Sequence, residues 1–249
     1  MEEEIEFGNF EYFPGGVPTG EYFAQKLWIL KAIIRRNEKE LDFQDLCYMG
    51  AMSYFEAFFK DLFAASLNIS PSLSKNISDK DNNKNARRNH SPDIDRDIDI
   101  MPGFLLSDKK DFGTADKVNK IYSDTLGITP FGPQEKEYFD RAKSIRNLIV
   151  HHGGIYNTKY RPERFTKEIN EKYKLFYRSV SISHKDNYIL IDNMASLARR
   201  TVVDVKNVIE KHAEENGIHL DKDRRDVLDL LAICSTEEEF YKINEPPED

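Results

Sequence analysis

One short stretch of the chain combines the residue types that cleave phosphodiesters. Residues 146–154 read R-N-L-I-V-H-H-G-G. An arginine stays charged and can neutralise the negative charge of a phosphorane-like transition state, whereas a histidine near its ordinary pKa can take up and deliver protons. An asparagine next to the arginine can hydrogen-bond a phosphate or hold a histidine. The candidate catalytic residues of this stretch are Arg146, Asn147, His151 and His152.

The arginine is expected to project from the apolar face of a helix. Apolar residues recur at helical spacing over residues 134–152, and two glycines then end the pattern. At about 100° per residue, Phe139, Ala142 and Ile149 lie within roughly 60° of Arg146. Since burying an unpaired guanidinium costs several kcal/mol, we expect Arg146 to be paired, used in function, or both.

A second helix is expected to bring a carboxylate to this arginine. The apolar stripe of residues 42–67 includes Met52 and Phe59, and it carries one charge, Glu56. Packing the two stripes together would place Glu56 within reach of Arg146. Two interpretations remain open: a buried ion pair that fixes the register of the helices, or a glutamate that orients Arg146 towards phosphate.

The spacing of arginine and histidine limits what one helix can do. Five residues correspond to a divergence of about 140° on a regular helix, so Arg146 and His151 do not easily face one phosphate. Either the helix is distorted at its glycine end, or a two-fold-related partner supplies the second copy. For His152, helix capping is as good an explanation as catalysis.

The pattern R-N-x-x-x-H at a helix end, followed by H-G-G, resembles the R-x4-6-H motif of the HEPN superfamily. Residues 48–62, with Glu56 at the centre, are similar to the first core helix of such domains, and the resemblance covers roughly residues 40–215. It implies a helical fold and a homodimer with a composite site. It further implies RNA cleavage to a 2′,3′-cyclic phosphate without metal or cofactor, by a toxin or anti-phage effector that an antitoxin or another defence-system protein could control. The alternative is a catalytically inactive HEPN-like module that binds a nucleotide, RNA or a protein partner.

A basic segment begins at the motif, although the chain as a whole carries a net charge of -8. Residues 141–178 contain ten Lys or Arg and three Glu, a net charge of +7, so the rest of the chain carries -15. Cations can follow phosphates and aromatic rings can stack on unpaired bases, but a solvated basic face is the competing interpretation. The candidate RNA-binding residues are Lys143, Tyr156, Lys159, Tyr160, Arg161 and Arg164.

The periodicities predict an all-α fold, a HEPN-like helical bundle with one small β-hairpin. The hairpin is expected from residues 176–182 and 188–191, which alternate around a polar turn. Three segments are expected: residues 1–39 with one helix, a helical domain over 40–216 with a polar insertion at about 70–113, and an acidic helical extension over 217–249. Besides the two helices above, we expect helices over 20–37 (capped by Thr19), 114–126, 162–174, 193–216 and 221–242.

Several functional classes are disfavoured by what the sequence lacks. No apolar run reaches the roughly 18 residues of a membrane helix. Nucleotide-binding, zinc-protease and serine-hydrolase motifs are missing, and the acids of residues 93–99 lack the glycine and closing glutamate of a calcium loop. The start of the chain is acidic, unlike a targeting peptide, and Cys47 and Cys234 suit reduced core thiols. We therefore expect a cytoplasmic protein without bound metal.

Overall fold

The fold is all-α. A computed structural model of the chain describes residues 11–76, 101–157 and 178–233. These residues form seven α-helices and two short 3-10 helices, and the only strand-like pairing among them is an isolated bridge between Ile155 and Ser179. The elements are η1 (Pro14–Gly16), α1 (Thr19–Arg36), α2 (Leu41–Ile69), η2 (Pro71–Asn76), α4 (Pro102–Asp108), α5 (Ala115–Leu126), α6 (Pro133–His152), α8 (His184–Glu215) and α9 (Lys222–Leu231).

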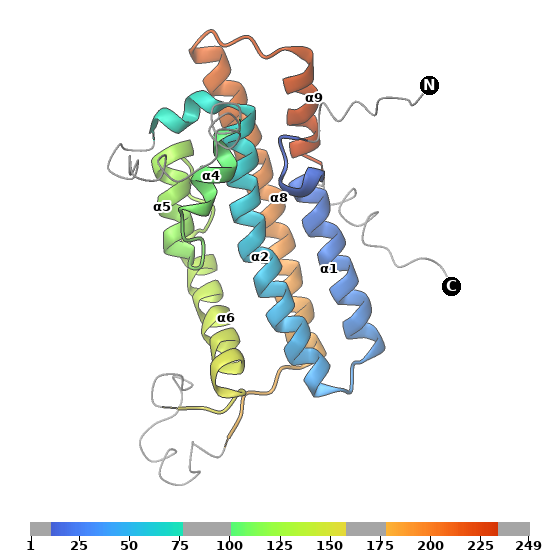
Figure 1. The fold of residues 1–249 in the computed structure, drawn as a ribbon. Helices are drawn as coiled ribbons and strands as arrows, with labels where there is room; N and C mark the ends of the chain where they lie inside the picture. The colour runs from blue at the N-terminus through green and yellow to red at the C-terminus, as the bar shows by residue number, and fades with distance from the viewer. Residues whose placement is uncertain (1–10, 77–100, 158–177, 234–249) are drawn as a thin grey trace, which may run out of the picture.

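Four long helices, α1, α2, α6 and α8, run side by side along the molecule (Figure 1). Helix α2 is the central one, because it contacts α1, α6 and α8 as well as the shorter α4 and α9. All eight residues from Leu62 to Ile69 are buried, as expected for a helix end that is covered on every side. One hydrophobic core includes Leu27 of α1, Phe59 of α2 and Leu228 of α9. The helices expected over 20–37, 42–67, 114–126 and 134–152 are confirmed within one or two residues.

Aromatic rings fill the contact between α2 and α6. Phe55 stacks on Phe139 with 4.7 Å between ring centroids, and Phe59 lies 5.1 Å from Phe131, which precedes α6. The fully buried Tyr122 of α5 donates a hydrogen bond from its hydroxyl to the carbonyl oxygen of Phe59 at 2.7 Å. Such pairs add specific geometry to the burial of large apolar surfaces, so they fix how α5 and α6 sit on α2.

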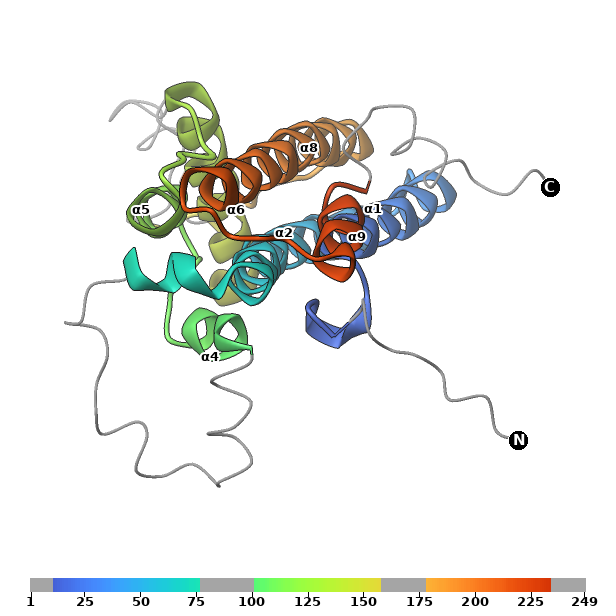
Figure 2. The same ribbon diagram turned by 90° about the horizontal axis from the view of Figure 1, so that it is seen from above.

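Helix α4 lies against the C-terminal part of α2, and its closest approach depends on a glycine (Figure 2). A Cβ atom at Gly103 would lie 1.9 Å from the carbonyl oxygen of Ala64, closer than any side chain permits. The amide of Asn68 completes the contact, since its oxygen accepts from Gly103 N at 2.8 Å and its nitrogen donates to the carbonyl of Tyr12 at 3.1 Å. This part of the expected polar insertion is therefore integrated into the fold.

The predicted β-hairpin is wrong. The residues expected to form its second strand lie inside α8, which begins at His184 instead of near residue 193. A capping box explains the earlier start: Ser183 Oγ accepts from Asp186 N at 3.2 Å, and Asp186 accepts from Ser183 N at 2.8 Å. Leu190, Ile191 and Met194 then form one continuous buried face, so the alternation was a fragment of a helical stripe.

The expected cap of the first helix is also wrong. Pro18 occupies the N-cap position of α1, and the hydroxyl of Thr19 is buried without a hydrogen-bond partner among the described residues. The helix expected over 221–242 begins as predicted but ends at Leu231, with a turn over 232–233. The helix expected over 162–174, most of the insertion, Cys234 and residues 234–242 lie outside the described residues. None of the described helices combines the length and apolarity that a membrane span requires.

Candidate functional site

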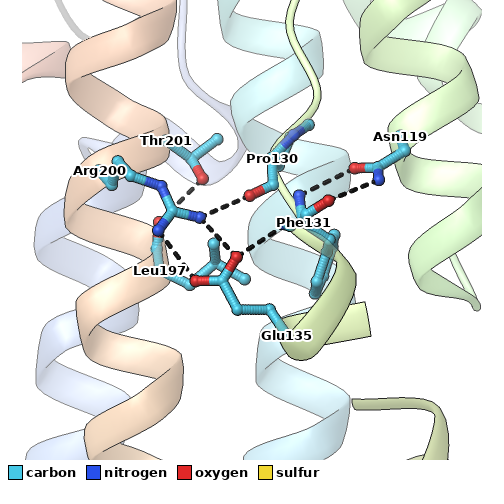
Figure 3. A network of polar contacts seen from close by, with 8 residues as sticks. Asn119, Pro130, Phe131, Glu135, Leu197, Arg200 and Thr201 are labelled. Carbon is cyan, nitrogen blue, oxygen red and sulfur yellow. Dashed lines mark hydrogen bonds and ion pairs between the residues drawn. The ribbon is translucent and has the colours of Figure 1, made fainter. Parts of the chain in front are cut away.

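A clamp to α8 fixes the start of α6, the helix that carries the motif. Arg200 donates to both carboxylate oxygens of Glu135 at 2.9 and 2.8 Å, and to the carbonyl oxygen of Pro130 at 2.7 Å (Figure 3). Glu135 also accepts from Gly132 N at 2.8 Å, which caps the helix. The Arg200 hydrogen bonds lower the pKa of the Glu135 carboxyl, with smaller contributions from the Gly132 amide and the Arg200 charge. The entry angle of α6 is therefore held by a charged, bidentate contact.

The end of α6 is set by glycine. Gly153 adopts a left-handed conformation with φ of 57°, which residues with a Cβ adopt only with strain. Its N–H bonds the carbonyl of Ile149 at 3.0 Å, and Gly154 N bonds the carbonyl of Leu148 at 3.1 Å. The helix continues to His152 before this turn, so Arg146 and His151 belong to one uninterrupted helix. Their side chains therefore point about 140° apart around the helix axis.

Arg146, Lys143 and Glu56 form a charged cluster at the edge between α2 and α6. Among the neighbouring charges, that of Arg146 lowers the pKa of the Glu56 carboxyl most, followed by that of Lys143. Burial raises the pKa of the Glu56 carboxyl, and this effect outweighs the lowering by the two cations. No ion pair joins Glu56 to either cation among the described residues, so their interaction is electrostatic at longer range.

Two cations of this cluster are available to an anion. Lys143 and Arg146 form no ion pair with a described carboxylate. Arg146 donates one hydrogen bond, from Nη1 to the side-chain oxygen of Asn147 at 3.1 Å, and its Nε is buried without a partner among the described residues. Asn147 thus orients the guanidinium, a role that the sequence did not assign to it. A buried N–H without an acceptor is costly, and a phosphate oxygen would supply one.

The two histidines lie apart from this cluster. His151 and His152 are exposed in the last turn of α6, and Arg146 makes no hydrogen bond to either of them among the described residues. The apolar side chains beside them, Val150 and Ile155, are 47% and 50% exposed. One protomer therefore brings Glu56 to Arg146 but does not bring His151 to Arg146.

The two ends of the segment that follows α6 are held together. Tyr156 N donates to the carbonyl of Arg178, and Val180 N donates to the carbonyl of Gly154, at 3.0 and 2.8 Å. Residues 154–156 and 178–180 therefore lie side by side at the histidine end of α6, with Tyr156 half-buried. The other candidate RNA-binding residues of the segment, Lys159, Tyr160, Arg161 and Arg164, lie outside the described residues.

Sequence analysis missed one charged neighbour, Asp111. It lies in the connector before α5, where it accepts hydrogen bonds from Lys117 Nζ and from Gly113 N, the latter at 2.8 Å. Those two bonds lower the pKa of the Asp111 carboxyl, and its charge in turn acts on Glu56. No periodicity marks a connector residue, so the sequence held no signal for this contact. Within the described ranges, no group of three or more His, Cys, Asp or Glu is arranged to hold a metal ion.

Comparison of the chain with protein-family models, with curated proteins and with solved structures gives no match. The features of this chain that bear on function are therefore its motif and the geometry of α2 and α6.

Proposed function

We propose that this chain is a metal-independent endoribonuclease of HEPN-like type that acts as a homodimer, in the manner of a toxin or anti-phage effector. The observation that supports the proposal best is that Arg146 is partly buried while its hydrogen-bonding capacity is only partly used. Arg146 is partly buried on the side of α6 that faces α2, and one of its N–H groups lacks an acceptor among the described residues. Lys143, one turn earlier, forms no ion pair with a described carboxylate, although its charge acts on Glu56 and Asp111. Two such cations on one helix favour the binding of a phosphate group.

The proposed reaction uses only side chains of this protein. A histidine, His151 or His152, removes the proton of an RNA 2′-hydroxyl, and the 2′-oxygen attacks the adjacent phosphorus. The bond from phosphorus to the 5′-oxygen breaks, a second imidazole protonates that oxygen, and a 2′,3′-cyclic phosphate remains. Arg146, oriented by Asn147, neutralises charge on the phosphorane-like transition state.

The proposal requires two protomers. A regular helix directs Arg146 towards α2 and leaves His151 exposed at its end, so the second residue must come from a two-fold-related copy. Exposed Val150 and Ile155 supply apolar surface beside the histidines, as an interface between the two helix ends needs. The basic segment 141–178 would flank the joint cleft and attract RNA.

A second candidate is a binding module without catalysis. The separation of Arg146 from His151 within one protomer favours it, because anion binding by Lys143 and Arg146 needs no histidine. In that case the module would hold a nucleotide, an RNA or an acidic protein surface through the same cations.

RNA cleavage by purified protein in EDTA separates the two candidates. We expect Arg146→Ala and His151→Ala each to reduce cleavage at least about 100-fold, the scale of losing one charge-stabilising or proton-transferring group. The controls are Arg36→Ala, an exposed arginine in the last turn of α1 and outside the basic segment, and His219→Ala, an exposed histidine after α8. Cleavage that His151→Ala retains would transfer the role to His152. RNA binding without cleavage in the unaltered protein would favour the binding module.

Mixed dimers test the composite site. An Arg146→Ala subunit mixed with a His151→Ala subunit leaves one complete pair if each arginine acts with the histidine of the other protomer, so heterodimers should regain part but not all of the activity. Heterodimers as inactive as the two variants alone would place both residues of a site in one protomer. A protein that remains monomeric at high concentration and still cleaves RNA at full rate would refute the dimer.

A further inference from the structure

A small cavity lies between the first half of α1 and the middle of α2. Its volume accommodates about one water molecule. Its lining includes the apolar Phe23 and Phe58, and also two residues with polar side chains, Thr19 of α1 and Asp61 of α2. The cavity is distant in sequence from the motif of α6, and the proposed function does not use it.

Neither of these polar groups has a partner among the described residues. Thr19 is only 4% exposed, and its hydroxyl has no hydrogen-bond partner among the described residues. The Asp61 carboxylate is half-buried and forms neither a hydrogen bond nor an ion pair with a described residue. A buried hydroxyl without a partner is unfavourable, and a poorly solvated carboxylate is more so. Two such groups bordering the same space call for a shared partner.

We propose that this cavity binds one ordered water molecule, which bridges the Thr19 hydroxyl and the Asp61 carboxylate. The water donates one hydrogen to the carboxylate and accepts from, or donates to, the hydroxyl, so both groups gain a partner. A metal cation is a poorer occupant because Lys26 also lines the cavity, and its ammonium group lies 4.7 Å from the centre of the Tyr22 ring, another lining residue.

The bridge connects three helices. Thr19 begins α1, and the next residue, Gly20, lies so close to the backbone after α9 that a Cβ would come within 2.6 Å of the Ile233 carbonyl oxygen. Asp61 lies on the central helix α2. A water that joins Thr19 to Asp61 therefore holds the start of α1, and with it the end of α9, against α2.

The test measures the pKa of Asp61 by carboxyl-carbon NMR. Burial raises the pKa of Asp61 to about 6, partly offset by the charge of Lys60, and a bridging water lowers it by stabilising the charged form. The other ionisable groups at the cavity are Lys26 and Tyr22 of α1 and Tyr54 of α2. Removing the hydroxyl should loosen the water and raise the pKa.

We expect Thr19→Val to raise the measured pKa of Asp61 by at least about 0.5, whereas Thr19→Ser, which keeps the hydroxyl, should leave it unchanged. Thr201→Val removes a buried hydroxyl that bonds the Leu197 carbonyl on α8, and it serves as the control for general destabilisation. The same pKa in the Val and Ser variants would overturn the proposal. So would a pKa that falls when sodium replaces choline at constant ionic strength, because a cation would then be the occupant.

Discussion

Breaking the clamp at the start of α6 should destabilise the protein by a predictable amount. Arg200→Met removes two charged hydrogen bonds to Glu135 and one to the carbonyl of Pro130, a buried residue. The side chains of Arg200 and Glu135 are 48% and 33% exposed, so solvent screening holds their coupling to about 1 kcal/mol. The carbonyl that loses its donor adds about 1 kcal/mol. We therefore expect a total of about 2 kcal/mol, or roughly 4–8 °C in Tm for a protein of this size.

Urea denaturation of Arg200→Met, Glu135→Gln and the double variant measures the coupling directly. Glutamine at position 135 keeps an oxygen that can accept from the Gly132 amide. The double-mutant cycle therefore reports on the charged contact between Arg200 and Glu135. The pKa of Glu135 is lowered in the folded state, so the Arg200–Glu135 pair stabilises the protein at pH values above the ordinary pKa of a glutamate carboxyl. This stabilisation is lost as pH falls below about 4. The difference in the free energy of unfolding between wild type and Arg200→Met should therefore become smaller at this acidic pH. Additive single effects at pH 7, with a coupling below about 0.3 kcal/mol, would refute the clamp.

Three further substitutions test the packing around the site. Tyr122→Phe removes the hydroxyl that bonds the Phe59 carbonyl, and it should cost about 1–2 kcal/mol in urea denaturation; an unchanged free energy would contradict that bond. Gly103→Ala forces a methyl group against the Ala64 carbonyl, and it should cost about 3 kcal/mol by thermal unfolding. The pKa of Glu56 is raised in the folded state, so ionisation of its carboxyl lowers the stability of the protein as pH rises. Glu56→Gln removes that charge and should therefore not destabilise the protein at pH 7. A loss above about 1 kcal/mol would instead indicate a direct ion pair.

The helices were predictable where one face is apolar over many residues. Residues 41–69 and 133–152 carry such stripes, and turn or capping residues mark their ends. The start of α8 was not predictable in this way, because its first turns contain enough alternation to resemble a strand. The position at which α8 begins is marked by the capping box at Ser183 and not by the hydrophobic pattern.

The contacts that position the candidate site could not be read from the sequence. Arg200 and Glu135 lie 65 residues apart, and neither belongs to a motif. The neighbourhood of Glu56 and Arg146 was expected from two apolar stripes, but the stripes could not tell an ion pair from the longer-range interaction that the structure has. Distances of this kind depend on side-chain direction and helix register, which periodicity leaves undetermined.

The rigidity of α6 links the fold to the proposed dimer. The helix is clamped to α8 at its start and closed by a left-handed glycine at its end, so both ends resist the unwinding that would turn Arg146 and His151 to the same side. The stacking of Phe139 on Phe55 of α2 also opposes a distortion of α6. If the protein cleaves RNA, distorting this helix would break several of these contacts, whereas docking a second copy would break none. A second protomer is therefore the less costly source of the missing histidine.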